Sequence, residues 1–167
     1  MTRTVSSMNL MSYVQGFMTS ELKRLSEELS EKHGVPKVEL SDVVDSFLKD
    51  TYGPALGKAG AICSKENPVA LFIGRKDCGI CQISQPQLEL FLADHKDVEL
   101  VKLDYGQPEG LLYHMIYQQR EGMLPLIAFI NKGCIKIVFT GECIYPEVFE
   151  KYYESLRSEC SQNLYAL

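Results

Sequence analysis

The first fifth of the chain shows a clear helical spacing of hydrophobic and polar positions. Apolar residues recur at intervals of three and four over 7–33, and oppositely charged residues lie four apart on the other side. Gly34 and Pro36 then end the predicted helix. Such a helix either packs on the rest of the protein or serves as a dimerisation or docking helix, and the pattern is compatible with both.

From residue 37 onward, short apolar runs alternate with amphipathic stretches. Apolar runs of this length predict buried strands, and stretches with a three-to-four spacing predict helices. The predicted order is β-α-β-α-β-α-β-β-α. The predicted strands are residues 38–40, 69–73, 98–103, 126–130 and 134–140, and the predicted helices are 42–51, 80–92, 108–116 and 146–156, with a Gly/Pro-rich loop at 52–60.

These elements together predict an α/β protein. Strands joined by helices become parallel neighbours, whereas the tight turn at 131–133 makes the last two strands antiparallel. We therefore expect a mixed central sheet with helices on both faces. The predicted organisation is a helical extension at 1–36, the sheet domain at 37–157 and a tail at 158–167.

Composition narrows the class of protein. The chain has 167 residues and a net charge of −5. Its apolar share of 46% is too high for a disordered chain. The acidic balance without a Lys/Arg cluster argues against nucleic-acid binding. No apolar run reaches the ~20 residues that span a bilayer, and residues 1–17 lack the continuous apolar core of a signal peptide. We expect a cytoplasmic protein with no membrane partner.

Cysteine usage is the next clue. An even cysteine count in a small secreted chain suggests a disulfide framework, but with no secretion signal we favour reduced thiols, one pair of which is catalytic. Cys134 and Cys143 flank one strand and are expected to be small buried residues, Cys63 is a weaker candidate for a third redox thiol, and Cys160 could form intermolecular bonds. The six cysteines are Cys63, Cys78, Cys81, Cys134, Cys143 and Cys160.

The pair Cys78 and Cys81 lies where a predicted strand gives way to a predicted helix. The first thiol then faces the helix N-terminus, where unpaired N–H groups and the macrodipole favour an anion. The thiolate is the reactive form of cysteine, so this placement predicts a nucleophile at Cys78. Cys81 is close enough to attack a mixed disulfide formed there. Asp77 opposes the Cys78 anion and Arg75 and Lys76 favour it, and the sequence does not decide between these effects.

The element order and this Cys-x-x-Cys junction resemble the thioredoxin family over residues 37–157. Further positions agree with the family's pattern: a helix proline five residues after the second cysteine, an Asp closing the third strand, a Pro opening the next helix, a Pro before the penultimate strand, a hairpin turn and a Gly near the end of the last strand. These are Pro86, Asp104, Pro108, Pro125, Lys132-Gly133 and Gly141.

The resemblance implies a thiol-disulfide oxidoreductase that reduces protein disulfides through Cys78 and Cys81. It implies that Leu124-Pro125 is a cis peptide bond whose backbone pairs with an extended substrate, and that Gly79, Ile80, Leu124 and Pro125 contact the substrate. It also implies an external reductase of the thioredoxin-reductase type as electron donor. The redox-active disulfide would then serve without any cofactor.

Three positions depart from the family pattern. Asp77 stands where thioredoxins usually carry Trp, and Ile80 stands where they carry Pro. Phe72 occupies the position of a buried Asp thought to help remove the proton from the second thiol. The resemblance therefore implies a divergent branch, in which water, another carboxylate or the leaving thiolate would take that proton.

Two other hypotheses remain open. The chain could be a binding module that keeps the fold as a scaffold and docks a partner, or a second copy, through its N-terminal helix. A metal site is disfavoured, because one Cys-x-x-Cys supplies two thiolates where structural zinc uses four ligands. His33, His95 and His114 show no paired spacing that would complete such a site, although an iron–sulfur cluster shared across a dimer through Cys78 stays an alternative.

Overall fold

The computed structural model describes residues 8–117 and 123–158. The strands are β1 (Met8–Asn9), β2 (Val69–Gly74), β3 (Glu99–Asp104), β4 (Leu126–Asn131) and β5 (Cys134–Thr140). Within the described residues they form one sheet in the order β1-β5-β4-β2-β3. β2 and β3 are parallel, and the other neighbours are antiparallel. The mixed sheet confirms the predicted fold class.

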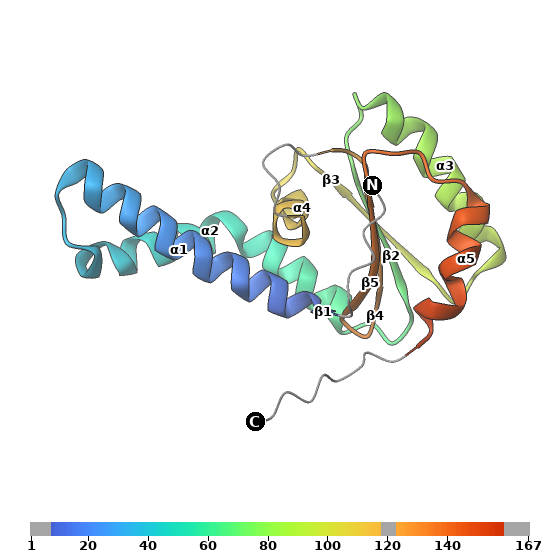
Figure 1. The fold of residues 1–167 in the computed structure, drawn as a ribbon, viewed down its shortest axis with the longest axis horizontal. Coiled ribbons are helices and arrows are strands. Elements are labelled where there is room, and N and C mark those ends of the chain that lie inside the picture. Colours follow the sequence, from blue (N-terminus) through green and yellow to red (C-terminus); the bar gives the residue numbers. More distant parts are fainter. Residues whose placement is uncertain (1–7, 118–122, 159–167) are drawn as a thin grey trace.

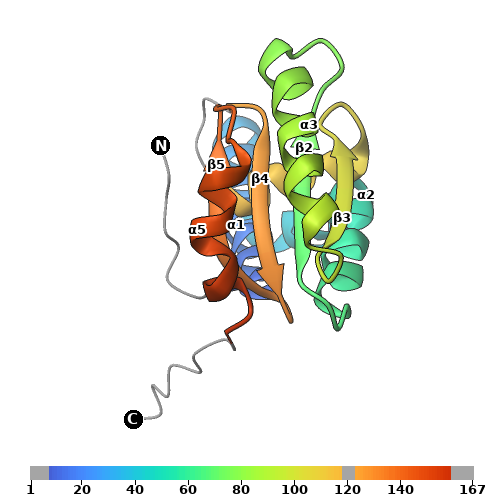
Figure 2. The same cartoon turned by 90° about the vertical axis from the view of Figure 1, so that its right-hand side faces the viewer.

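The helices cover both faces of this sheet. They are α1 (Leu10–His33), α2 (Lys37–Cys63), α3 (Gly79–Asp94), α4 (Leu112–Ile116) and α5 (Pro146–Leu156), with a 3-10 turn at Pro108–Leu111 before α4. Figure 1 shows α1, α2 and α4 on one side of the sheet and α3 and α5 on the other. Figure 2, turned by 90°, shows α3 and α5 side by side in front of the strands.

The two covered faces explain why β2 is apolar at every position. Val69, Leu71 and Ile73 pack into the core beneath α1, α2 and α4, whereas Ala70 and Phe72 pack into the core beneath α3 and α5. Side chains alternate across a strand, so a strand buried on both sides must be apolar throughout. This burial gives β2 a fixed register between β3 and β4.

The predicted strand at 38–40 and loop at 52–60 are wrong, whereas the predicted helix at 42–51 is confirmed as part of a longer helix. A single helix, α2, runs through all three segments. Its buried residues lie along one side of the helix at spacings that the Gly/Pro content obscured. Packing of that side outweighs the hydrogen bond lost at Pro54. The buried residues are Val44, Leu48, Ala55, Ala59 and Ile62.

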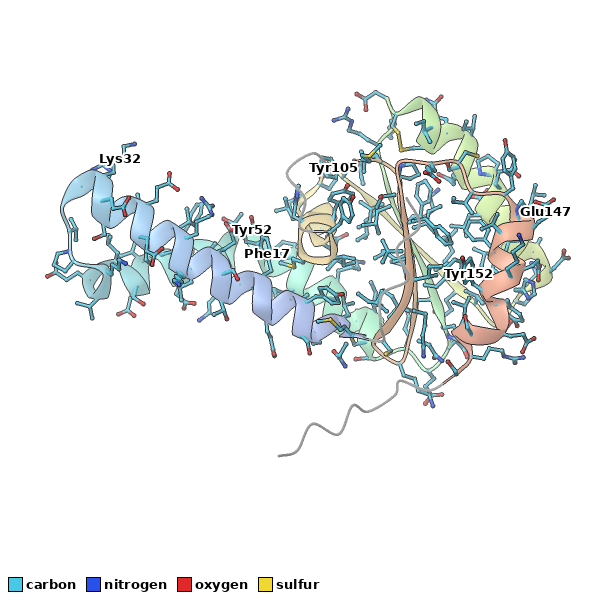
Figure 3. The ribbon with its side chains drawn as sticks, in the orientation of Figure 1. Phe17, Lys32, Tyr52, Tyr105, Glu147 and Tyr152 are labelled. Atoms are coloured by element: carbon cyan, nitrogen blue, oxygen red, sulfur yellow. A yellow bond between two sulfur atoms is a disulfide. The ribbon has the colours of Figure 1, made fainter. Side chains whose placement is uncertain are left out.

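α1 and α2 form a helical hairpin that extends away from the sheet (Figure 1). Gly34 ends α1 in the left-handed conformation, with φ of 67°, and the chain reverses into α2. The rings of Phe17 and Tyr52 pack edge to face between the two helices, with their centroids 5.0 Å apart (Figure 3). No helix among the described residues is long and apolar enough to cross a membrane.

The near end of α1 is built into the sheet. β1 pairs with β5, and the Leu10 amide donates to the Gly133 carbonyl at 2.7 Å. Leu10 and Val14 are buried in the same core as β2. The predicted helix at 7–33 is therefore confirmed from residue 10, and it packs on the protein, while docking of a partner is untested. Ser7 and all of the predicted tail except Ser158 lie outside the described residues, and the domain boundaries stay a prediction.

This integration gives a stability test for α1. Replacing Leu10 by Ala removes apolar volume at a fully buried position, so we expect the free energy of unfolding to fall by about 2–5 kcal/mol. Urea denaturation of the full chain measures it. The matched control is Val43→Ala at a position that is 66% exposed, which we expect to change stability by about 0.5 kcal/mol or less. A neutral Leu10→Ala result would mean that α1 is not part of the sheet's folding unit.

Candidate active site

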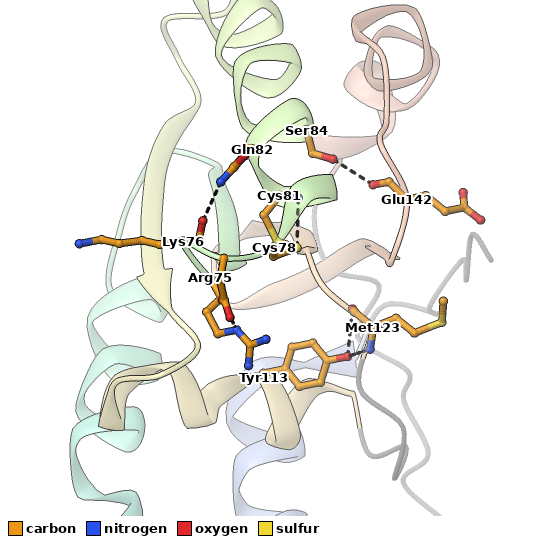
Figure 4. The surroundings of a disulfide bond; sticks show 10 residues. Arg75, Lys76, Cys78, Cys81, Gln82, Ser84, Tyr113, Met123 and Glu142 are labelled. Carbon is orange, nitrogen blue, oxygen red and sulfur yellow. Dashed lines mark hydrogen bonds and ion pairs between the residues drawn. A yellow bond between two sulfur atoms is a disulfide. The ribbon is translucent and has the colours of Figure 1, made fainter.

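The carboxyl end of β2 brings the Cys78–Cys81 pair close to the sheet. A Cβ on Gly74, the last residue of β2, would lie 2.7 Å from Cε1 of Phe72 and 3.4 Å from the Cβ of Cys81. Glycine suits this position because a Cβ would overlap the Phe72 ring and would fill the space against Cys81 in the first turn of α3. The loop that follows is held by the Gln82 side-chain amide, which donates to the Lys76 carbonyl at 2.7 Å (Figure 4).

Cys78 and Cys81 form a disulfide at the N-terminus of α3. Cys78 is the N-cap residue, and its Sγ accepts a hydrogen bond from the Cys81 amide at 3.2 Å. An N-cap acceptor satisfies one of the amides that a helix leaves unpaired, and a thiolate there gains from the helix dipole. The first turn of α3 carries no acidic residue to oppose that charge.

The two sulfurs differ in burial. Cys81 is 4% exposed and belongs to the core beneath α3 and α5, whereas Cys78 is half-buried at its edge. Phe72 is part of the same core, 4% exposed, at the position where the resemblance predicted a departure from an acidic residue. The pair therefore presents one accessible sulfur and one sheltered sulfur against an aromatic ring.

The charged residues before Cys78 partly cancel. The Arg75 guanidinium donates to the Asp77 carboxylate, and both side chains are at least half exposed. This pairing leaves Lys76 as the cation whose charge is not offset within the loop. The opposing effects that the sequence left undecided thus reduce to a weak, solvent-screened balance.

The Leu124–Pro125 bond is cis, as the resemblance implied. Pro125 is buried, and its carbonyl accepts from the Gly141 amide at 2.9 Å. Leu124 and Cys78 both pack at the edge of the core that contains Cys81. On the other side of the pair, Gly79 and Ile80 are exposed in the first turn of α3, with Ile80 41% exposed. The fold thus brings the predicted substrate contacts to one end of the sheet.

Tyr113 holds the loop before Pro125, and sequence reasoning missed it. Its hydroxyl accepts from the Met123 amide at 2.7 Å and donates to the Met123 carbonyl at 3.1 Å (Figure 4). Tyr113 is fully buried, and Met123 is 54% exposed. Gly141, with φ of 71°, leaves room for the Met123 side chain, because a Cβ there would lie 2.7 Å from the Met123 Cβ. No local pattern links two residues ten positions apart, so the sequence carried no signal for this contact.

A cavity of about 480 Å³ opens on the sheltered side of Cys81. It lies where β2 and β3 end and α3 begins. Its apolar lining includes Phe72, Leu103 and Cys81, its charged groups come from β3 and the loop after β2, and two glutamines come from α3. The charged and amide-bearing lining residues are Arg75, Lys76, Gln82, Gln85, Lys102 and Asp104.

Of the other cysteines, Cys63 is the one that the structure places far from the pair. Cys63 and Cys143 are free thiols, and burial raises the pKa of the Cys63 thiol. Cys63 lies beside Gly133 in the β4–β5 turn, at the opposite end of the sheet from Cys78. Since β2 spans ~20 Å at 3.3 Å per residue, Cys63 does not reach the pair directly. Cys134 is buried as predicted, but it is disulfide-bonded, which corrects the expectation of a reduced thiol at this position. Cys143 is only partly buried, and Cys160 lies outside the described residues.

No group of three or more His, Cys, Asp or Glu side chains suited to a metal ion occurs in the part of the chain that the structure describes. His33, His95 and His114 thus belong to no such cluster there. His114 Nε2 forms a hydrogen bond of 3.1 Å with the Tyr105 hydroxyl, and burial lowers the pKa of the His114 imidazole. His95 pairs with Glu150 at 2.7 Å beside α5. These contacts identify both residues as packing groups away from the disulfide.

Comparison with known proteins finds likeness in structure only. No family model matches the chain, and no curated protein sequence matches it. Oxidised mitochondrial thioredoxin 3 from Saccharomyces cerevisiae shares 17% identity, covering 60% of this chain and 89% of that one, with a TM-score of 0.48. Reduced thioredoxin 2 from Pseudomonas aeruginosa shares 24% identity, with 59% and 86% covered and a TM-score of 0.48. Thioredoxin F from spinach chloroplast shares 20% identity, covering 68% of this chain and 82% of that one, with a TM-score of 0.46.

The topology of this chain is by itself enough to describe the fold as thioredoxin-like. The mixed sheet with its antiparallel final hairpin, the cysteine pair at the start of α3 and the cis-proline before β4 agree with the expectation from the sequence. The helical hairpin and the absence of a strand at 38–40 distinguish its first 63 residues from that expectation.

The contact between Tyr113 and Met123 gives a direct test of this loop. In Tyr113→Phe the Met123 amide loses its acceptor, so we expect its hydrogen exchange to speed up and the protein to lose about 1–3 kcal/mol of stability. Tyr105→Phe is the matched control, because it removes a hydroxyl from the same aromatic cluster that bonds His114 and not Met123. Equal exchange of the Met123 amide in both variants would contradict the assigned role.

Proposed function

We propose that this chain is a thiol-disulfide oxidoreductase that reduces protein disulfides by cycling Cys78 and Cys81 between dithiol and disulfide. The observation that carries the proposal is the disulfide at the start of α3, which joins the half-buried N-cap residue Cys78 to Cys81, a residue that is 4% exposed. An accessible attacking sulfur with a sheltered resolving sulfur is the arrangement that two-step exchange requires.

In the first step the Cys78 thiolate attacks one sulfur of a substrate disulfide. A new S–S bond forms at Cys78, the substrate bond breaks, and the departing substrate thiolate takes up a proton. The Cys81 amide, which donates to Cys78 Sγ, and the N-terminus of α3 both stabilise the attacking anion.

In the second step Cys81 loses its proton and attacks Cys78 Sγ. The intramolecular disulfide forms, and the second substrate sulfur leaves as a thiolate that becomes a thiol. Phe72 offers no base, so the cavity beside Cys81 is the route by which its proton leaves. That cavity far exceeds the ~30 Å³ that a water occupies, and Lys76 and Lys102 line it as cations that favour the Cys81 thiolate.

The substrate would lie over the accessible sulfur. Gly79 and Ile80 flank it on one side, and the backbone of Leu124 before Pro125 offers its N–H and C=O to an extended segment. Two electrons from an external reductase of the thioredoxin-reductase type would return the pair to the dithiol. We place the reaction in the cytoplasm, where such a donor keeps thiols reduced.

A binding module is the second candidate, favoured by the helical hairpin. Val38, Val43 and Phe47 are 82%, 66% and 57% exposed on the first half of α2, beyond the sheet. A scaffold that docks a partner or a second copy through this hairpin requires neither thiol. Thiol substitutions therefore separate the two candidates.

The first test is reduction of insulin disulfides with dithiothreitol as donor. We expect Cys78→Ser to abolish turnover, since no thiolate remains to attack the substrate, and Cys81→Ser to accumulate a mixed disulfide at Cys78 that mass spectrometry detects. Cys63→Ser is the control, because it removes a free thiol at the opposite end of the sheet and should retain activity. Turnover that survives in Cys78→Ser would refute the proposed cycle.

The charge balance before Cys78 gives a second test. Asp77→Asn removes the anion nearest in sequence, so a larger fraction of Cys78 should be thiolate and alkylation by iodoacetamide at pH 7 should speed up by about two- to fivefold. Arg75→Gln should slow it by a similar factor. The double variant should return close to the wild-type rate, and two changes in the same direction would show that the ion pair is not what sets the reactivity.

A further inference from the structure

The cavity beside Cys81 collects positive charge from separate segments of the chain. Lys102 lies opposite Phe72 in the parallel register of β2 and β3, so both residues lie on the sheet face that α3 covers. Lys76 reaches the cavity from the loop after β2. Asp104 is the one carboxylate in the lining, and its Oδ1 already accepts from the Gly106 amide at 2.8 Å.

The two lysines have no partner within the described part of the chain. No hydrogen bond or ion pair to either ammonium group occurs there, whereas Lys58, Lys65 and Arg75 are paired with carboxylates. Each paired carboxylate lies outside the cavity lining. The cavity therefore holds a net positive charge that the protein itself does not neutralise.

The position of the cavity in the fold is typical of a ligand site. The carboxyl ends of parallel strands are where α/β sheets bind ligands, and β2 and β3 both end at this cavity. The volume of about 480 Å³ falls within the range of small-molecule sites. Phe72 and Leu103 add an apolar wall, so the lining has the mixture of apolar surface and few charged groups that such sites show.

We propose that this cavity is a binding site for a small polyanionic molecule, one that carries phosphate or carboxylate groups held by Lys76 and Lys102. Lysine ammonium groups bind such oxygens as point charges, and the two lysines approach from β3 and from the β2–α3 loop. The Gln82 and Gln85 side chains line the same wall and offer polar groups beside them.

Occupation of the cavity couples to Cys81. The bound anion neutralises the two cations and adds negative charge beside the sheltered sulfur, so it disfavours the Cys81 thiolate. This coupling rests on the proposed function, because it slows the second exchange step. The binding itself does not, since the cavity is present with the disulfide closed.

The test is calorimetric titration of the oxidised full chain with inorganic pyrophosphate and, separately, with citrate, at constant ionic strength. We expect at least one of the two anions to bind saturably. In NMR spectra of the same titration, the backbone amide signals of β3 and of the first turn of α3 should shift. Tighter binding of pyrophosphate would identify phosphate as the preferred group, and tighter binding of citrate would identify carboxylate. Lys76→Met and Lys102→Met should each weaken binding by about tenfold, the loss of one charge-assisted contact.

Lys96→Met is the matched control, because Lys96 is an exposed lysine at the opposite end of α3 and should leave the affinity unchanged. Absence of binding by both anions, or an affinity in both Lys76→Met and Lys102→Met that is unchanged from the wild type, would overturn the site. Circular dichroism of each variant excludes misfolding as the cause of a loss. Because no turnover is measured, a failed insulin assay leaves this result intact.

The coupling has its own readout. In Cys78→Ser, an anion concentration just sufficient to saturate the cavity should slow alkylation of Cys81 about threefold or more when both lysines are present. At the same anion concentration the slowing should be clearly smaller once Lys102 is Met, because less of the protein is occupied. Unchanged alkylation with bound anion would overturn the coupling while the binding site stands.

Discussion

The close approach of the first turn of α3 to the end of β2 is the constraint on which the candidate site depends. Gly74 permits it, since a Cβ there would overlap the Phe72 ring and contact Cys81. Because the helix begins against the strand, Cys81 is buried in the core while Cys78 stays at its edge as the N-cap. The difference between the two sulfurs therefore follows from packing.

The same packing makes Phe72 consequential. An aromatic ring at this position fills the core beneath α3 and removes any acid–base group from the immediate contacts of Cys81. The cavity that Cys81 lines carries charged groups, and these are mainly cationic. A cationic setting favours a thiolate by electrostatics, without a proton acceptor, and it also attracts anions from solution. Catalysis and ligand binding would then draw on the same charges.

The helical hairpin and the loop before Pro125 show how distant parts support this end of the molecule. α1 enters the core at Leu10 and Val14, and α2 closes the same face of the sheet with Ala55, Ala59 and Ile62. Tyr113, buried in that core, reaches through it to bond the backbone of Met123. The face opposite α3 thus supports the loop that lies beside the disulfide.

Strong local signals let the sequence by itself determine β2 to β5, α1, α3, α5 and the Cys78–Cys81 junction. A strand buried on both faces must be apolar throughout, and an amphipathic helix repeats its apolar residues every three to four positions, so each reveals itself in a short window. Residues 38–60 show the limit: Gly53, Pro54 and Gly57 predict a break, and only packing against α1 and the sheet makes α2 continuous. The Tyr113–Met123 contact, the pairing of Arg75 with Asp77 and the cation-lined cavity likewise belong to the tertiary structure. They join residues from separate segments or fix one of several side-chain positions, and neither leaves a trace in local periodicity.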